Sequence, residues 1–161
     1  MYTKQKDRCN IMSTFKDEIE KNRNSVDNAN QAWEQTKTLA EMQLECATGV
    51  LEVAKKVLHN AGSSKEAVEF VTKNVTNQIK ALETLKPMVN KCYTAYASAL
   101  ITETAIVREL IKANSYIANI ENKKCSTFSL QIGNLIDKLN KVLIDRAAGV
   151  DGSDGYGRLE R

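Results

Sequence analysis

Apolar and small residues recur along most of this chain at steps of three, four and seven, which is the spacing of one face of an α helix. The pattern predicts a first long helix between residues 12 and 60. Short polar residues crowd residues 22–30, and their side chains compete for backbone hydrogen bonds, so a break there is an alternative. The predicted buried face contains Ile19, Val26, Trp33, Ala40, Leu44, Ala47, Leu51, Ala54 and Leu58.

A turn is predicted at residues 60–64. Gly62 there has the place of a helix C-cap, and Ser63 stands three residues before Glu66, in the order of a capping box. The only histidine, His59, lies at the expected end of the first helix, where an imidazole is expected to interact with the helix dipole and the last carbonyl groups.

A second apolar stripe runs through residues 68–117. Pro87 interrupts it and either kinks one helix or separates two, because proline removes a helical hydrogen bond. A polar run at residues 121–126 predicts another turn, and a shorter helix then ends near Ala148. We therefore expect an all-α fold, an elongated antiparallel bundle of three to four long helices.

The composition agrees with long helices. The 161 residues include one proline and seven glycines, and four of these glycines lie between residues 149 and 157. We expect a single helical-bundle domain at residues 1–148 and a flexible, glycine-rich tail at residues 149–161, which has too few apolar residues to bury.

Four cysteines are spread widely along the chain, and none forms a Cys-x-x-Cys pair or stands near the histidine at zinc-site spacing. Their even number favours two disulfides that pin the bundle, although four reduced core thiols are an alternative. In one long antiparallel hairpin, the pairs Cys46–Cys92 and Cys9–Cys125 would lie at similar heights. A break in the first helix would favour Cys9–Cys46 and Cys92–Cys125 instead.

Several classes of chemistry lack their motifs. The sequence has no phosphate-binding glycine loop, no His-Glu-x-x-His and no Gly-x-Ser-x-Gly, so we expect no enzyme, no cofactor and no metal site. Positive and negative residues are interspersed around a formal charge of +3, which argues against nucleic-acid binding. Every apolar run is too short to span a membrane.

Long helices with few breakers, expected disulfides and a flexible tail resemble the architecture of surface antigens and receptors of parasitic protozoa and of secreted helical proteins of arthropods. The resemblance implies an extracellular or cell-surface protein, although it assigns no role to any residue. No signal peptide follows Met1, so export would require a signal outside this sequence. Asn74 begins an Asn-Val-Thr glycosylation motif, which matters only if the chain is exported.

Two functions are expected from this pattern. The first is a non-enzymatic module that binds a host or self protein through a small apolar cluster at a turn or kink. The candidate contacts are Val68 and Phe70 beside the first turn, and Met88 and Tyr93 beside Pro87. The alternative is an extracellular carrier that holds a lipid or another small hydrophobic ligand between its helices. Trp33 is expected in the core rather than at a binding surface.

Overall fold

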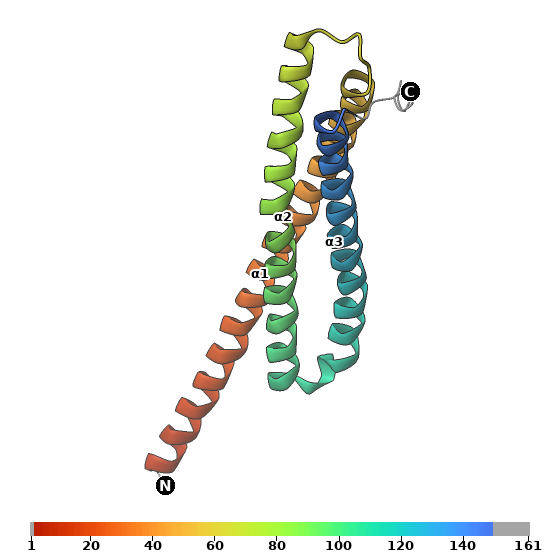
Figure 1. Cartoon of the computed structure of the whole chain (residues 1–161). Coiled ribbons are helices and arrows are strands. Elements are labelled where there is room, and N and C mark those ends of the chain that lie inside the picture. Colours follow the sequence, from red (N-terminus) through yellow and green to blue (C-terminus); the bar gives the residue numbers. More distant parts are fainter. Residues whose placement is uncertain (1, 150–161) are drawn as a thin grey trace. The chain divides into compact units, whose positions relative to one another are not determined.

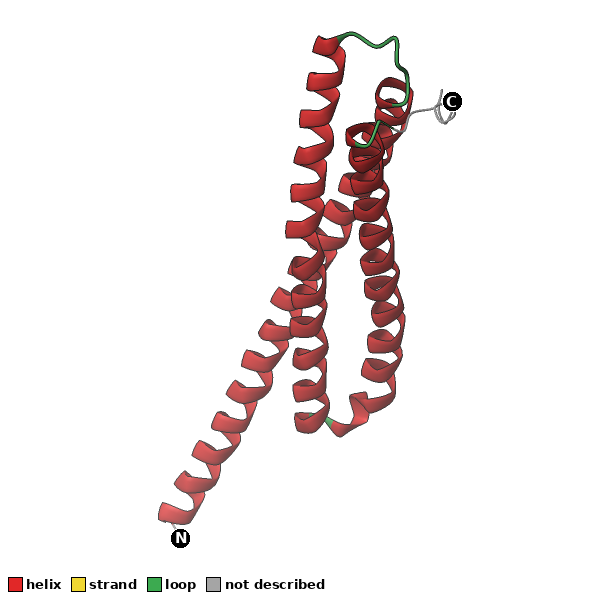
Figure 2. Cartoon of the chain, in the orientation of Figure 1, coloured by secondary structure: helices red, strands yellow, loops and turns green. Residues whose placement is uncertain are grey.

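A computed structural model describes the backbone of residues 2–149 and the side chains of residues 14–149. These residues form three α helices and no strand, which confirms the all-α helical bundle (Figures 1 and 2). The helices are α1 (Tyr2–Leu58), α2 (Lys65–Ile106) and α3 (Ile111–Ala147), and a short 3-10 turn, η1 (Arg108–Leu110), joins α2 to α3.

The chain forms two compact units, and every helix contributes one segment to each of them. Unit 1 contains the part of α1 up to Thr36 together with Asn90–Cys125, and unit 2 contains Lys37–Val89 and the described residues 126–149. Each unit therefore has three helical layers, and its core can be described separately.

Unit 2 has an aliphatic core to which α1 contributes three alanines together with Leu51 and Leu58, and α2 and α3 contribute valine, leucine and isoleucine side chains. Ala40, Ala47 and Ala54 are fully buried at seven-residue intervals, so α1 can approach the other helices closely. The facing residues are Val71, Val75, Ile79, Leu82, Leu85 and Val89 of α2 and Ile132, Leu139 and Val142 of α3. This packing explains why the alanines recur along the predicted apolar face.

Unit 1 has a smaller core that includes several polar groups. Trp33 is fully buried, as predicted, and its ring meets that of Tyr93 edge to face at a centroid distance of 5.6 Å. The Trp33 indole nitrogen donates a hydrogen bond to Glu121 Oε1 at 2.8 Å. Glu103 and Asn114 are also buried, at 4% and 6% exposure, so part of this core is held by hydrogen bonds.

The first turn lies where it was predicted, but its caps differ from those expected. Ser64 rather than Ser63 caps α2, because its Oγ accepts a hydrogen bond from the backbone nitrogen of Ala67 at 3.1 Å. Ser63 Oγ donates to the Val57 carbonyl at 2.8 Å instead. The last carbonyl of α1, that of Leu58, is bonded by the Arg146 guanidinium at 2.9 Å. Arg146 therefore fulfils the capping role expected of His59.

The helix boundaries resolve the alternatives left by the sequence. Helix α1 passes through the asparagine cluster without a break, and α2 continues through Pro87 as one helix. The second turn lies at Val107–Leu110 rather than at residues 121–126, which are helical in α3. Val107 turns the chain because its backbone is extended, at φ −121° and ψ 91°.

The structure contains no disulfide among the cysteines whose side chains it describes. Cys46, Cys92 and Cys125 form no disulfide with one another, so the Cys46–Cys92 bridge and the Cys92–Cys125 alternative are absent. The position of the first turn explains why the Cys46–Cys92 bridge is absent. Gln78 Nε2 donates a hydrogen bond to Cys46 Sγ and Gln78 Oε1 accepts one from Gln43 Nε2, which places Cys46 level with Gln78. The side chain of Cys9 lies outside the described residues, and the pairings that involve it stay predictions.

Thiol labelling under native conditions should follow the burial of these three cysteines. We expect a maleimide to modify exposed Cys46 first, half-buried Cys92 more slowly, and Cys125, which is 5% exposed, last. Peptide mass spectrometry of a time course reads the order, and a denatured sample in which all three react together is the control. A cross-linked Cys46–Cys92 peptide in an unreduced digest would contradict the structure.

Candidate functional site

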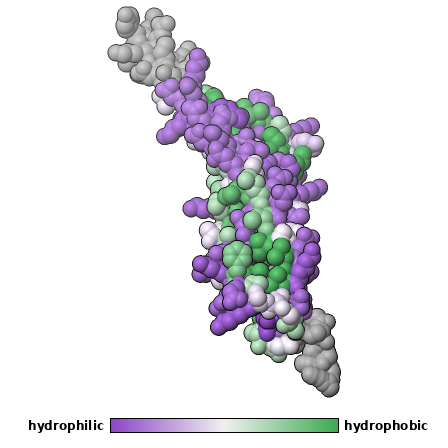
Figure 3. Space-filling model, turned by 90° about the horizontal axis from the view of Figure 1, so that it is seen from above, coloured by the Kyte–Doolittle hydropathy of each residue, from purple (hydrophilic) through white to green (hydrophobic). Residues whose placement is uncertain are grey.

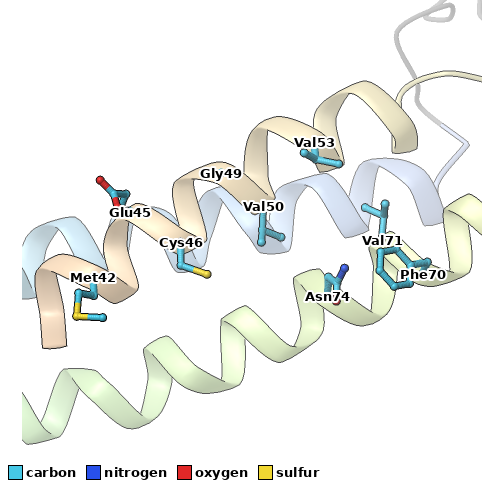
Figure 4. A pocket seen from close by; sticks show the side chains of 9 residues that line it. All are labelled: Met42, Glu45, Cys46, Gly49, Val50, Val53, Phe70, Val71 and Asn74. Carbon is cyan, nitrogen blue, oxygen red and sulfur yellow. The ribbon is translucent and has the colours of Figure 1, made fainter.

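The strongest candidate site is a groove between α1 and α2 within unit 2, which we call the α1–α2 groove (Figure 4). It has a volume of about 760 Å³. Its lining residues are Met42, Glu45, Cys46, Gly49, Val50 and Val53 of α1 and Phe70, Val71 and Asn74 of α2. Most of these side chains are apolar. Binding of an apolar partner in the groove would therefore be favourable, because it removes apolar surface from water.

Helical periodicity creates the α1 wall of the groove. Met42, Cys46, Gly49 and Val53 follow one another at steps of four, three and four, so they form a second stripe beside the alanine stripe of the core. Figure 4 shows Cys46 and Val50 pointing toward α2, whereas Glu45 points away from it. A Cβ atom added at Gly49 would meet no side chain and no neighbouring helix within 4 Å, so this position of the wall faces open space.

Three large apolar side chains along the groove are exposed to solvent. Met42 is 64% exposed, Val53 52% and Phe70 67%. Single exposed apolar residues are common on protein surfaces, but several around one hollow are typical of a binding site. Figure 3 shows that hydrophobic residues reach the surface in a patch bordered by hydrophilic ones.

Phe70 is the one predicted contact residue that lies in this groove. Val68 and Met88 are half-buried residues of unit 2 that do not line it, and Tyr93 belongs to unit 1. The Tyr93 hydroxyl donates a hydrogen bond to the Ala118 carbonyl at 3.1 Å. Burial raises the pKa of Tyr93, and the nearby Cys125 and Glu121 raise it further, so the phenol stays protonated and keeps this bond.

Asn74, the candidate glycosylation site, is half buried on the α2 wall, and its side chain points toward α1 in Figure 4. A glycan attached there would occupy the groove. Glycosylation of Asn74 stays a prediction, and it would compete with any partner that docks at this place.

Unit 1 contains a polar cluster that the sequence did not reveal. Arg23 Nη1 donates to Glu103 Oε2 at 2.7 Å, and Asn114 Nδ2 donates to Glu103 Oε1 at 3.1 Å. Arg23 also forms an ion pair with Asp27 at 3.0 Å. The hydrogen bond to Asp27 is the main reason that the pKa of Arg23 is raised, and the negative charge of Glu103 raises this pKa as well. Both oxygens of the Glu103 carboxylate are therefore engaged, which suits a structural ion pair better than an acid or base in catalysis.

His59 does not form a catalytic pair in the described part of the chain. Its Nε2 atom is buried without a hydrogen-bond partner, and the nearest carboxylate oxygen, Asp145 Oδ2, lies 4.0 Å away. Among residues 14–149, no three side chains of His, Cys, Asp or Glu gather as a metal site would require. Within the described helices, none is long and apolar enough to cross a membrane.

Comparison with known proteins does not assign this chain to a family. Models of protein families, curated proteins and solved structures were compared with the chain, and none matches it. The proposals below therefore depend on the residues of this chain alone.

Proposed function

We propose that the chain is a non-enzymatic, protein-binding helical module and that its docking surface is the α1–α2 groove. The observation that carries this proposal is the exposure of Met42, Val53 and Phe70 around one hollow. Burying a side chain of this size yields about 1.5–3 kcal/mol. Three such residues beside one another can therefore supply the centre of a protein interface.

The shape of the groove suits an amphipathic helix. Its α1 wall extends from Met42 to Val53, which is about 17 Å at 1.5 Å per residue, or three helical turns. A partner helix could place apolar side chains at matching intervals of three and four residues against this wall. Because Gly49 has no side chain and faces open space, the backbone of the partner helix could approach α1 closely at this position.

Peptide binding tests the proposal directly. Amphipathic helical peptides of about three to six turns, selected from a displayed library against the wild-type chain, should bind at the groove. We expect Phe70→Asp to weaken the selected peptides on the order of 30-fold, the equivalent of about 2 kcal/mol for a central contact residue. Fluorescence anisotropy measures the affinity, and circular dichroism verifies that helicity is unchanged.

Ile144→Asp provides the matched control, because Ile144 is 64% exposed in the same unit and does not line the groove. This variant should bind the selected peptides as the wild type does. Equal binding by the wild type and by Phe70→Asp would show that the groove is not the docking surface.

A carrier of small hydrophobic ligands is the second candidate, because about 760 Å³ falls within the usual size range of ligand sites. The Asn74 amide could orient one polar group of such a ligand. Native mass spectrometry of the purified chain separates the two functions: a stoichiometric lipid that Phe70→Asp loses would favour the carrier.

An extracellular or cell-surface location is also a proposal. Its support is the Asn-Val-Thr motif at Asn74. The cysteines give it no support, because those with described side chains form no disulfide with one another. Expression through a secretory route, followed by glycosidase treatment of the wild type and of Asn74→Gln, tests it. A mass shift confined to the wild type is the expected result.

A further inference from the structure

We infer that unit 1 contains a separate binding site for a small, neutral, apolar molecule that carries one O–H or N–H donor. The site is a cavity between α2 and α3, which we call the α2–α3 cavity. The α1–α2 groove lies in unit 2, so this inference does not depend on the proposed function. It is carried by the apolar lining of the cavity and by an acceptor of Asn114 that no described residue uses.

The α2–α3 cavity has a volume of about 260 Å³, and all of its lining residues lie within Asn90–Cys125. Its apolar lining comes from Ala97, Leu100 and Ile101 of α2 and from Ala118 of α3. An engineered apolar cavity of roughly 150 Å³ in another protein binds benzene. The α2–α3 cavity therefore has room for a molecule built on a single ring.

Two alanines explain why the helices leave this space. The Tyr93 hydroxyl donates to the Ala118 carbonyl at 3.1 Å, which places Ala118 level with Tyr93. Ala97 follows Tyr93 by four residues, so the two alanines lie within about one turn of each other along the helix pair. Their methyl groups fill less of the space between α2 and α3 than larger side chains would. Ile101, which is 71% exposed, forms the outer edge of the cavity.

The amide nitrogen of Asn114 is fully engaged with α2. Asn114 is 6% exposed, and its Nδ2 donates to the Leu100 carbonyl at 3.3 Å and to Glu103 Oε1 and Thr104 Oγ1 at 3.1 Å each. The Thr104 hydroxyl uses its own proton for the Leu100 carbonyl, so all three partners of Nδ2 are acceptors. The orientation of the amide is therefore fixed, and its oxygen, Oδ1, is turned away from these three groups.

Asn114 Oδ1 accepts no hydrogen bond from a described residue. The oxygen is not sealed in the core, because among the described side chains the one fully enclosed polar atom without a partner is His59 Nε2. Asn114 lines the cavity, so a molecule inside it can reach Oδ1. Since a buried acceptor without a donor costs free energy, a ligand that brings an O–H or N–H group is favoured over one that does not.

The other polar groups of the cavity are less suited to select a donor. The hydroxyl protons of Tyr93 and Thr104 are used by backbone carbonyls, and Ser115 is exposed, so water can bond to it freely. None of the described residues that line the cavity is charged. A neutral ligand therefore fits better than an ion, whose charge would be left without a partner.

Two probes that differ in the donor test the inference on the full chain. 4-Fluorophenol carries an O–H group, and in 4-fluoroanisole a methyl group replaces that hydrogen. We expect 4-fluorophenol to bind about fivefold more tightly, the equivalent of roughly 1 kcal/mol for one hydrogen bond. Fluorine NMR measures both affinities. The side-chain amide signals of Asn114 in a proton–nitrogen correlation spectrum should shift on addition of 4-fluorophenol.

Variants locate the probe and identify its acceptor. Ala97→Trp fills the cavity and should abolish binding of both probes. Tyr116→Asp is the matched control, because Tyr116 is 69% exposed in unit 1 and does not line the cavity. Tyr93→Phe and Ser115→Ala each remove another hydroxyl from the lining and should keep the fivefold preference for the phenol. Circular dichroism verifies that each variant is folded.

No binding of 4-fluorophenol at millimolar concentration would overturn the inference and leave water as the occupant of the cavity. Binding that persists in folded Ala97→Trp would place the probe elsewhere, with the same consequence. Equal affinity for the two probes, or a preference lost in Tyr93→Phe or Ser115→Ala, would refute the role of Asn114. None of these variants changes a residue of the α1–α2 groove, so peptide binding there is judged separately.

Discussion

Trp33→Ala is expected to lower the free energy of unfolding of unit 1 by about 3–5 kcal/mol, the range for truncation of a buried aromatic residue. Trp33 has no exposed surface, and its ring packs edge to face on Tyr93. Its indole nitrogen also donates the 2.8 Å hydrogen bond to Glu121, whose side chain is 13% exposed. Alanine at this position would leave a cavity, and Glu121 Oε1 would lose the hydrogen bond from the indole nitrogen.

Trp33→Phe separates the two contributions. It keeps an aromatic ring in the core but removes the hydrogen bond to Glu121, so its cost should be smaller than that of alanine. Because Trp33 is the one tryptophan of the chain, unfolding in urea must be followed by circular dichroism rather than by tryptophan fluorescence. Equal stability of the wild type and Trp33→Ala would show that this part of the core is not packed as described.

The difference between the two turns shows what sequence patterns can predict. Residues 60–64 carry local signals, since Asn60 accepts a hydrogen bond from the backbone of Gly62 and Ser64 caps the next helix. The turn at Val107–Leu110 contains neither glycine nor proline, and none of the residues of η1 is buried. The polar run at residues 121–126 was a weaker indication, because a solvent-facing side of a helix has the same composition.

Placement of the second turn also determines which cysteines can meet. In the structure, Cys125 donates a hydrogen bond to the Asn90 side chain, which sets α3 level with that part of α2. Cys92 is two residues further along α2 and therefore points to a different side of the helix. Residue numbers alone cannot show such a rotation, which is why the Cys92–Cys125 alternative did not follow from them.

The sequence pattern did not predict the groove, although it named one of the residues that line it. Phe70 was identified from its position beside the first turn, whereas the α1 wall was missed. Two apolar stripes share the period of α1, and the stripe with the smaller residues, Ala40, Ala47 and Ala54, is the buried one. The sequence pattern assigned this buried face correctly, but it gave no role to the second stripe, which contains Met42 and Val53.

Arg23→Ala is expected to destabilise unit 1 more than Glu103→Ala does, although the two residues form one ion pair. Glu103 is 4% exposed, whereas the Arg23 side chain is 51% exposed and regains water when its partner is removed. Removing Arg23 leaves a buried carboxylate with the Asn114 amide as its remaining hydrogen-bond donor among the described residues. Loss of one partner of a fully buried pair costs about 3–5 kcal/mol, and the exposure of Arg23 reduces the expected cost to about 2–3 kcal/mol.

The double variant Arg23→Met/Glu103→Leu distinguishes an uncompensated charge from a general loss of packing. Apolar residues of similar size remove both charges, and Asn114 keeps its hydrogen bonds to the Leu100 carbonyl and to Thr104. We expect this variant to be at least as stable as Arg23→Ala and to approach the wild type in urea unfolding. If it is less stable than either single alanine variant, the ion pair itself stabilises unit 1, and the cost of Arg23→Ala does not come from a stranded carboxylate.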